Sequence, residues 1–221
     1  MSLESQSRAR LDDEGGHLLD QLRDSWDHYG KIALGVIVAI AAIGVVAFFT
    51  MRSRHDSEDQ ASGRLAEATL YYFQGDLNRA KETARRVADQ YPNTPSGADA
   101  HRVMGDAAFW STDYKTAVAE YRRYLPKAPK GVLSDAATRS LAYALENDHQ
   151  PAEAAKLYES IVGKFDRESS AEFLAAAARC KRATGDRAGA KQLLERLVSE
   201  FGETSYARNA RLAIAELSVA P

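Results

Sequence analysis

The longest apolar stretch of the chain runs from residue 32 to residue 51 and contains no charged side chain. Lys31 precedes this stretch, and Arg52 and Arg54 follow it. At a rise of about 1.5 Å per residue, a helix of this length measures ~30 Å, which matches the hydrocarbon thickness of a bilayer. A water-soluble helix needs a polar face, and this stretch has none. The pattern predicts one transmembrane helix over residues 32–51.

A cleaved signal peptide is the alternative interpretation of the same stretch. The apolar core of a signal peptide spans only ~7–15 residues, ends at small residues and follows a short basic segment. In this chain a longer and mostly polar segment comes first. The sequence therefore favours a permanent anchor over a cleaved signal.

Small side chains recur on one face of the predicted membrane helix. Gly35, Ala39 and Ala42 fall at helical spacing, and such a face lets another helix approach closely. We therefore expect packing against an integral membrane subunit, although glycine and alanine are also common in membrane helices that have no partner. Just before the helix, Trp26 and Tyr29 are expected at the headgroup level, as interfacial aromatic residues are. The segment that carries them is acidic, which favours a neighbouring membrane protein over anionic lipid as its partner. An amphipathic lead-in that has no partner is the alternative.

Beyond residue 57 the chain has helical composition and a repeated register. Four turns of similar sequence each contain an alanine, and these alanines are separated by 37, 37 and 36 residues. A fixed period in this range indicates stacked helical hairpins. The shared alanines are Ala80, Ala117, Ala154 and Ala190.

Three further columns keep the same period. Small residues precede the shared alanines by twelve positions, and mostly bulky residues follow them by four and seven positions. Small side chains let the two helices of a hairpin cross closely, and bulky ones fill the space between hairpins. In chain order the three columns are Ala68, Gly105, Ala142 and Ala178; Ala84, Tyr121, Tyr158 and Leu194; and Val87, Tyr124, Ile161 and Leu197.

These patterns predict an all-α protein with four parts. A polar tail with an amphipathic juxtamembrane helix covers residues 1–31, the transmembrane helix covers 32–51, a linker covers 52–56, and the repeat domain covers 57–218. Within the repeat domain we expect four helix pairs, forming an α-solenoid, and a last helix that caps the stack.

Composition and motifs point away from catalysis. The net charge of −2 gives no basic excess for nucleic acid. The single cysteine, Cys180, excludes an internal disulfide and a cysteine-based zinc site, and we expect it to be packed rather than reactive. The five histidines are scattered, and no phosphate-binding loop or nucleophile elbow is present. We expect no enzyme activity, cofactor or metal ion.

The repeats resemble tetratricopeptide repeats. The small-residue column, the shared alanine, the aromatic residue or leucine after it and the closing Pro92 and Pro129 match that family's motif, whereas the family's first-helix tryptophan is absent. In this family the first helices of the pairs line a concave, protein-binding face, and ordinary exposed side chains are the alternative at these positions. The resemblance implies that this face is formed by Tyr72, Arg102, Asp106, Phe109, Arg139, Tyr143, Arg179 and Arg182.

The layout of the whole chain resembles the YfgM type of bacterial protein, which accompanies the protein-conducting channel and periplasmic chaperones. Charges on the two sides of the membrane helix are nearly balanced, so they do not decide its orientation. The resemblance implies a cytoplasmic N-terminus and a periplasmic repeat domain in the bacterial inner membrane. Two roles stay open: an accessory subunit of a translocon, respiratory or photosynthetic complex, braced on integral subunits and on an extrinsic protein, or a transient adaptor for secretory clients or chaperones.

Overall fold

The computed structural model describes residues 3–219, with side chains for residues 29–32 and 34–218. Over these residues the chain forms nine α-helices and no strand, so the predicted all-α class is confirmed. The chain divides into two compact units, residues 1–55 and 56–221. Helix α1 (Leu3–Phe73) contributes to both units and includes residues 52–56, which the sequence analysis assigned to a linker. The four-part division itself stays a prediction.

The first unit contains the apolar part of α1. One helical stretch of the described residues, Tyr29–Phe73, is long and apolar enough to cross a membrane, and the mean hydropathy of its most apolar window is 2.9. Every described side chain between residues 34 and 51 is exposed, and a Cβ added at Gly35 would meet no neighbour. Tyr29 is exposed too, whereas Trp26 lies outside the residues whose side chains are described. This unit therefore presents an apolar surface that nothing within the unit covers.

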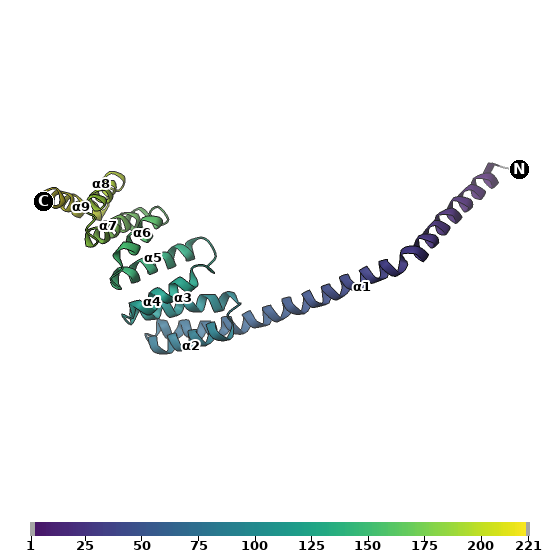
Figure 1. The fold of residues 1–221 in the computed structure, drawn as a ribbon, viewed down its shortest axis with the longest axis horizontal. Helices are drawn as coiled ribbons and strands as arrows, with labels where there is room; N and C mark the ends of the chain where they lie inside the picture. The colour runs from purple at the N-terminus through teal and green to yellow at the C-terminus, as the bar shows by residue number, and fades with distance from the viewer. Residues whose placement is uncertain (1–2, 220–221) are drawn as a thin grey trace. The chain divides into compact units, whose positions relative to one another are not determined.

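The second unit is a stack of four helix pairs and a last helix, each packed against its neighbour in sequence (Figure 1). The predicted four pairs and capping helix are thereby confirmed. In chain order, the end of α1 pairs with α2 (Leu77–Gln90), α3 (Pro95–Trp110) with α4 (Tyr114–Tyr124), α5 (Val132–Asn147) with α6 (Pro151–Ile161), and α7 (Arg167–Ala183) with α8 (Arg187–Glu200), and α9 (Ser205–Val219) covers α7 and α8.

Each helix pair is joined by a turn that contains one residue in the left-handed backbone region. These residues occupy one position of the repeat and are Gly75, Thr112, His149 and Gly185, with φ of 80°, 59°, 57° and 84°. In three of the turns an aspartate follows and caps the second helix, because its carboxylate accepts a backbone N–H three residues ahead. The fourth turn lacks this cap, and Pro151 starts its helix instead.

The columns predicted from the sequence form the core of the stack. All four shared alanines are fully buried, as are the bulky residues seven positions later. Gly105 shows why its column must be small, since a Cβ there would lie 2.8 Å from a carbon of the Tyr121 ring. Cys180 is buried in the same core, and burial, with Glu146 nearby, raises the pKa of its thiol to about 11.

Candidate protein-binding pocket

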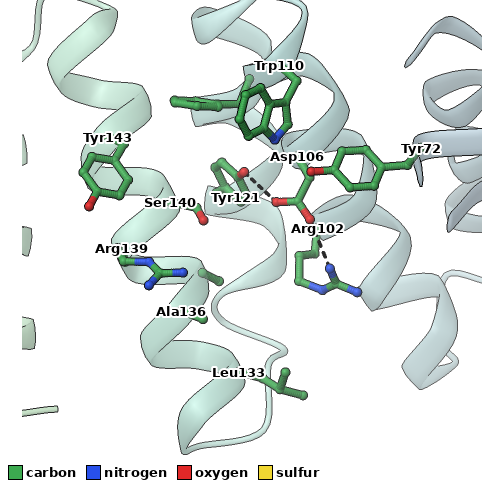
Figure 2. Close-up of a pocket in the computed structure, with 12 residues that line it drawn as sticks. Tyr72, Arg102, Asp106, Trp110, Tyr121, Leu133, Ala136, Arg139, Ser140 and Tyr143 are labelled. Carbon is green, nitrogen blue, oxygen red and sulfur yellow. Dashed lines mark hydrogen bonds and ion pairs between the residues drawn. The ribbon is translucent and has the colours of Figure 1, made fainter. Parts of the chain in front are cut away.

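A pocket of about 450 Å³ lies among the helices of the first three repeats, and we call it the α3–α5 pocket (Figure 2). Six residues expected on the binding face line it: Tyr72, Arg102, Asp106, Phe109, Arg139 and Tyr143. The remaining lining residues are Trp110, Tyr121, Leu133, Ala136, Ala137 and Ser140. The structure therefore brings together most of the predicted set, although whether they bind a partner stays a prediction.

Helical spacing explains why these side chains meet. Arg102, Asp106 and Phe109 recur on one face of α3, and Ala136, Ser140 and Tyr143 do the same on α5. The two helices are the first members of successive pairs, so the repeat sets their facing sides next to each other.

A chain of polar contacts forms the floor of the pocket. The Tyr121 hydroxyl donates to Asp106 Oδ1 at 2.7 Å, and Arg102 Nη1 donates to Asp106 Oδ2 at 3.1 Å (Figure 2). Burial raises the pKa of Asp106, and the hydrogen bond from Tyr121 and the charge of Arg102 offset only part of this rise. Burial and the charge of Asp106 also raise the pKa of the Tyr121 hydroxyl, which therefore stays a donor. Asp106 is thus already paired within the chain.

The same arrangement recurs in the next repeat. Tyr158 occupies the repeat position of Tyr121, and its hydroxyl donates to Glu146 Oε2 at 2.8 Å. Arg179 of the following repeat donates to both oxygens of Glu146, at 2.6 and 2.9 Å. Burial opposes ionisation of Glu146, but the hydrogen bonds from Arg179 and Tyr158 outweigh it, so its pKa is lowered. Arg179, expected to face a partner, is therefore exposed but already paired with a carboxylate of the chain.

Arg139 differs from the other arginines of the pocket. Its guanidinium carbon lies 5.2 Å from the centre of the Phe165 ring, and no carboxylate of the described residues lies within ion-pair distance of it. The neighbouring Tyr143 hydroxyl donates to Glu172 at 2.7 Å, so that carboxylate has a partner of its own. Arg139 is the lining cation whose charge is not matched by a bonded carboxylate.

Two exposed aromatic side chains lie at or beside the pocket. Trp110 is 66% exposed and Phe73 is 78% exposed, and the two residues occupy the same position of successive repeats. Trp110 and Tyr72 also line a second hollow of about 390 Å³, together with Phe73, Gly75 and Leu77. We call this the Phe73 hollow. Water-exposed aromatic surface of this kind is enriched where proteins bind proteins.

Sequence reasoning missed Trp110 and Leu133, both of which line the pocket and are exposed. The signal available in the sequence was an aromatic residue at the same repeat position, Phe73 and then Trp110. Two predicted residues lie elsewhere: Arg179 and Arg182 line a separate hollow of about 280 Å³ beside α9. Among the described residues no group of three or more His, Cys, Asp or Glu side chains is placed to hold a metal ion.

Comparison with known proteins agrees with this architecture. Models of the tetratricopeptide repeat match residues 65–132 and 176–204. A crystal structure of TPR-like repeats from a putative kinesin light chain of Podosopora anserina is similar at 20% identity and a TM-score of 0.56, covering 72% of this chain and 86% of that one. A second, of YrrB, described as a TPR protein with an unusual peptide-binding site, is similar at 16% identity and a TM-score of 0.56, covering 70% and 74%. No curated protein matched the sequence.

The helix pairs, their turns and these matches define the class of the repeat region. It is a TPR-like solenoid, a fold that typically serves as a scaffold for protein interactions. Residues 65–132 and 176–204 match tetratricopeptide repeats, the type of repeat that the sequence analysis predicted.

Proposed function

We propose that this protein is a membrane-anchored scaffold that binds a partner protein in the α3–α5 pocket. The observation that carries the proposal is the pocket itself, where exposed Trp110 and unpaired Arg139 stand on helices of a fold that binds peptides or proteins. A peptide-binding site in YrrB, a protein of similar fold, supports this use of the repeats. The proposed site also includes Tyr72, Phe109 and Tyr143.

The membrane part of the proposal rests on the first unit. Transfer of an uncovered apolar helix from water into a bilayer lowers the free energy. Residues 32–51 have the length and composition to span a bilayer. We propose that Gly35, Ala39 and Ala42 pack against an integral subunit and that Trp26 and Tyr29 lie at the headgroups. The likeness of the layout to YfgM-type proteins supports a cytoplasmic N-terminus and periplasmic repeats at the bacterial inner membrane.

Within this scheme the protein acts as an accessory subunit of a larger inner-membrane complex. Its helix and tail contact integral subunits, and its repeats hold an extrinsic protein. The complex is of the translocon, respiratory or photosynthetic kind.

Mild-detergent extraction of native membranes tests this proposal. We expect the full chain to pellet with membranes after alkaline carbonate washing and to elute in a stoichiometric complex after solubilisation. A chain that stays in the membrane but elutes with a scatter of weak partners would favour the transient adaptor instead. A mature protein that lacks residues 1–51 and is found in the aqueous fraction would show a cleaved signal and contradict the anchor.

Orientation has a separate test. Protease added to sealed spheroplasts should digest the repeats and leave the N-terminal tail intact. Digestion of the tail with intact repeats would reverse the proposed topology.

A further inference from the structure

We propose that the occupant of the α3–α5 pocket is an extended segment of the partner protein that carries an aspartate or glutamate beside large apolar side chains. The acidic side chain pairs with Arg139, and the apolar side chains fill the α3–α5 pocket and the Phe73 hollow on either side of Trp110. This inference rests on the proposed function and names the chemistry that the site selects.

The charges of the pocket select an acid over a base. Asp106 already receives hydrogen bonds from Tyr121 and Arg102, so a lysine or arginine of a partner would find no free carboxylate there. The charge of Arg102 is likewise matched by two carboxylates, Asp106 at 3.1 Å and Asp99 at 3.6 Å, although its buried Nε makes no hydrogen bond with a described residue. Arg139 alone among the lining charges lacks an ion-pair partner within the described part of the chain.

The position of Arg139 suits a ligand. Its guanidinium lies against the Phe165 ring, a contact that orients the planar fork without using its hydrogen-bond donors. The guanidinium fork matches a carboxylate in a two-bond arrangement, so the geometry of the free donors favours that group. Tyr143, on the same face of α5, is committed to Glu172 and does not compete for the carboxylate.

The apolar part of the occupant follows from the walls. Trp110 and Tyr72 each line both hollows, so the two hollows share an aromatic wall. Phe73 adds exposed apolar surface to the Phe73 hollow, and Leu133 adds it to the α3–α5 pocket. An occupant that buried only its acid would leave this surface in water, and therefore large apolar side chains on both sides of Trp110 complete the match.

Trp110 also provides the readout. The chain contains two tryptophans, Trp26 and Trp110, so the full-length variant Trp26→Phe in detergent micelles reports on Trp110 alone. The probes are short peptides with both termini blocked, in which one glutamate stands between leucine and phenylalanine. Matched peptides carry glutamine in place of the glutamate, lysine in place of the glutamate, or serine in place of both apolar residues. Blocking the C-terminus removes the main-chain carboxylate, so that only the side-chain acid is tested.

We expect the glutamate peptide to shift Trp110 emission to the blue and to bind at least about tenfold more tightly than its glutamine and lysine counterparts. The serine peptide should give no shift. Arg139→Gln should bind the glutamate and glutamine peptides equally, a result that also shows the variant to be folded. Arg85→Gln, at an exposed position of α2 outside both hollows, should keep the full preference.

Equal affinity for the glutamate and glutamine peptides, a preference that survives Arg139→Gln, or no binding of any peptide would each overturn the inference. The proposed function is judged separately, by the complex retained after mild-detergent extraction. If extraction yields a stoichiometric complex but the peptides show no preference for the acid, the proposed scaffold function is retained and only the proposed ligand chemistry is wrong.

Discussion

Tyr121 and Asp106 are joined by a 2.7 Å hydrogen bond that runs from the second helix of one repeat to the first helix of the same repeat. The ring of Tyr121 also packs against Gly105, one residue before the aspartate. A single tyrosine thus sets how closely α3 and α4 cross and holds in place the carboxylate at the floor of the α3–α5 pocket.

Removing the Tyr121 hydroxyl should therefore destabilise the stack. We expect Tyr121→Phe to lower the free energy of unfolding by about 1–2 kcal/mol, because Asp106 would keep its burial and lose a donor. Tyr124→Phe is the matched control, since the Tyr124 hydroxyl is buried and makes no hydrogen bond with any described residue. Its removal should be neutral or slightly stabilising. Urea unfolding followed by circular dichroism measures both, and equal losses would contradict this assignment.

A methyl group at Gly105 should also be costly. We expect Gly105→Ala to lower the free energy of unfolding by about 1–3 kcal/mol. The added Cβ would press on the Tyr121 ring and push α3 away from α4. Gly63→Ala, on an open face of α1, should instead gain about 0.5–1 kcal/mol from helix propensity. The same urea experiment compares them, and a loss at Gly63 as large as that at Gly105 would exclude a packing cause.

The left-handed turn position gives a prediction of the opposite sign. Thr112 is a β-branched residue at φ 59°, where its side chain is strained, whereas Gly75 and Gly185 occupy the same position without strain. We expect Thr112→Gly to raise the free energy of unfolding by up to about 1 kcal/mol, the greater freedom of glycine in the unfolded chain offsetting part of the gain. Gly185→Ala should lower it by about 1 kcal/mol. Thermal unfolding checks the pair, and a destabilised Thr112→Gly would refute the strain argument.

The helix pairs and their core were predictable because the residues that form them recur at the repeat length. The small column at Gly105 and the bulky column at Tyr121 each recur at the repeat length, and a buried face must repeat whenever the hairpin repeats. Six pocket residues were predictable because the register aligned the repeats and the resemblance to tetratricopeptide repeats implied that the first helices line the binding face.

The pairing of charges was not predictable from the register. Arg179 and Glu146 are 33 residues apart, and their two-bond contact depends on rotamers and on the spacing of α5 and α7. Asp106 was likewise expected to face a partner, yet its carboxylate accepts hydrogen bonds from Tyr121 and Arg102. Trp110 was missed because a column of exposed aromatic residues in only two repeats gives a weak periodic signal.

Acid should loosen the contact between the third and fourth repeats. The pKa of Glu146 is lowered in the folded state, since the bonds from Arg179 and Tyr158 outweigh the effect of burial. A lowered pKa adds stability that is complete above the ordinary value of 4.5 and is lost as the pH falls through the lower folded value. We expect Glu146→Gln to lower the melting temperature at pH 7 and to reduce the further loss below pH 4.5.

The control for this prediction is Glu82→Gln, which removes an exposed pair with Arg86 on α2. A surface ion pair contributes little, so the melting temperature at pH 7 should change much less than in Glu146→Gln. Identical acid profiles for wild type and Glu146→Gln would show that this carboxylate does not stabilise the fold.

The most direct test of a membrane-held scaffold places a photo-crosslinking amino acid at Trp110 in the full chain and irradiates intact membranes. A matched probe at Arg85 lies outside the α3–α5 pocket and the Phe73 hollow. The account predicts one discrete crosslinked product in the membrane fraction from position 110 and none from position 85. A chain that forms no adduct from position 110, or equal adducts from both positions, would contradict it.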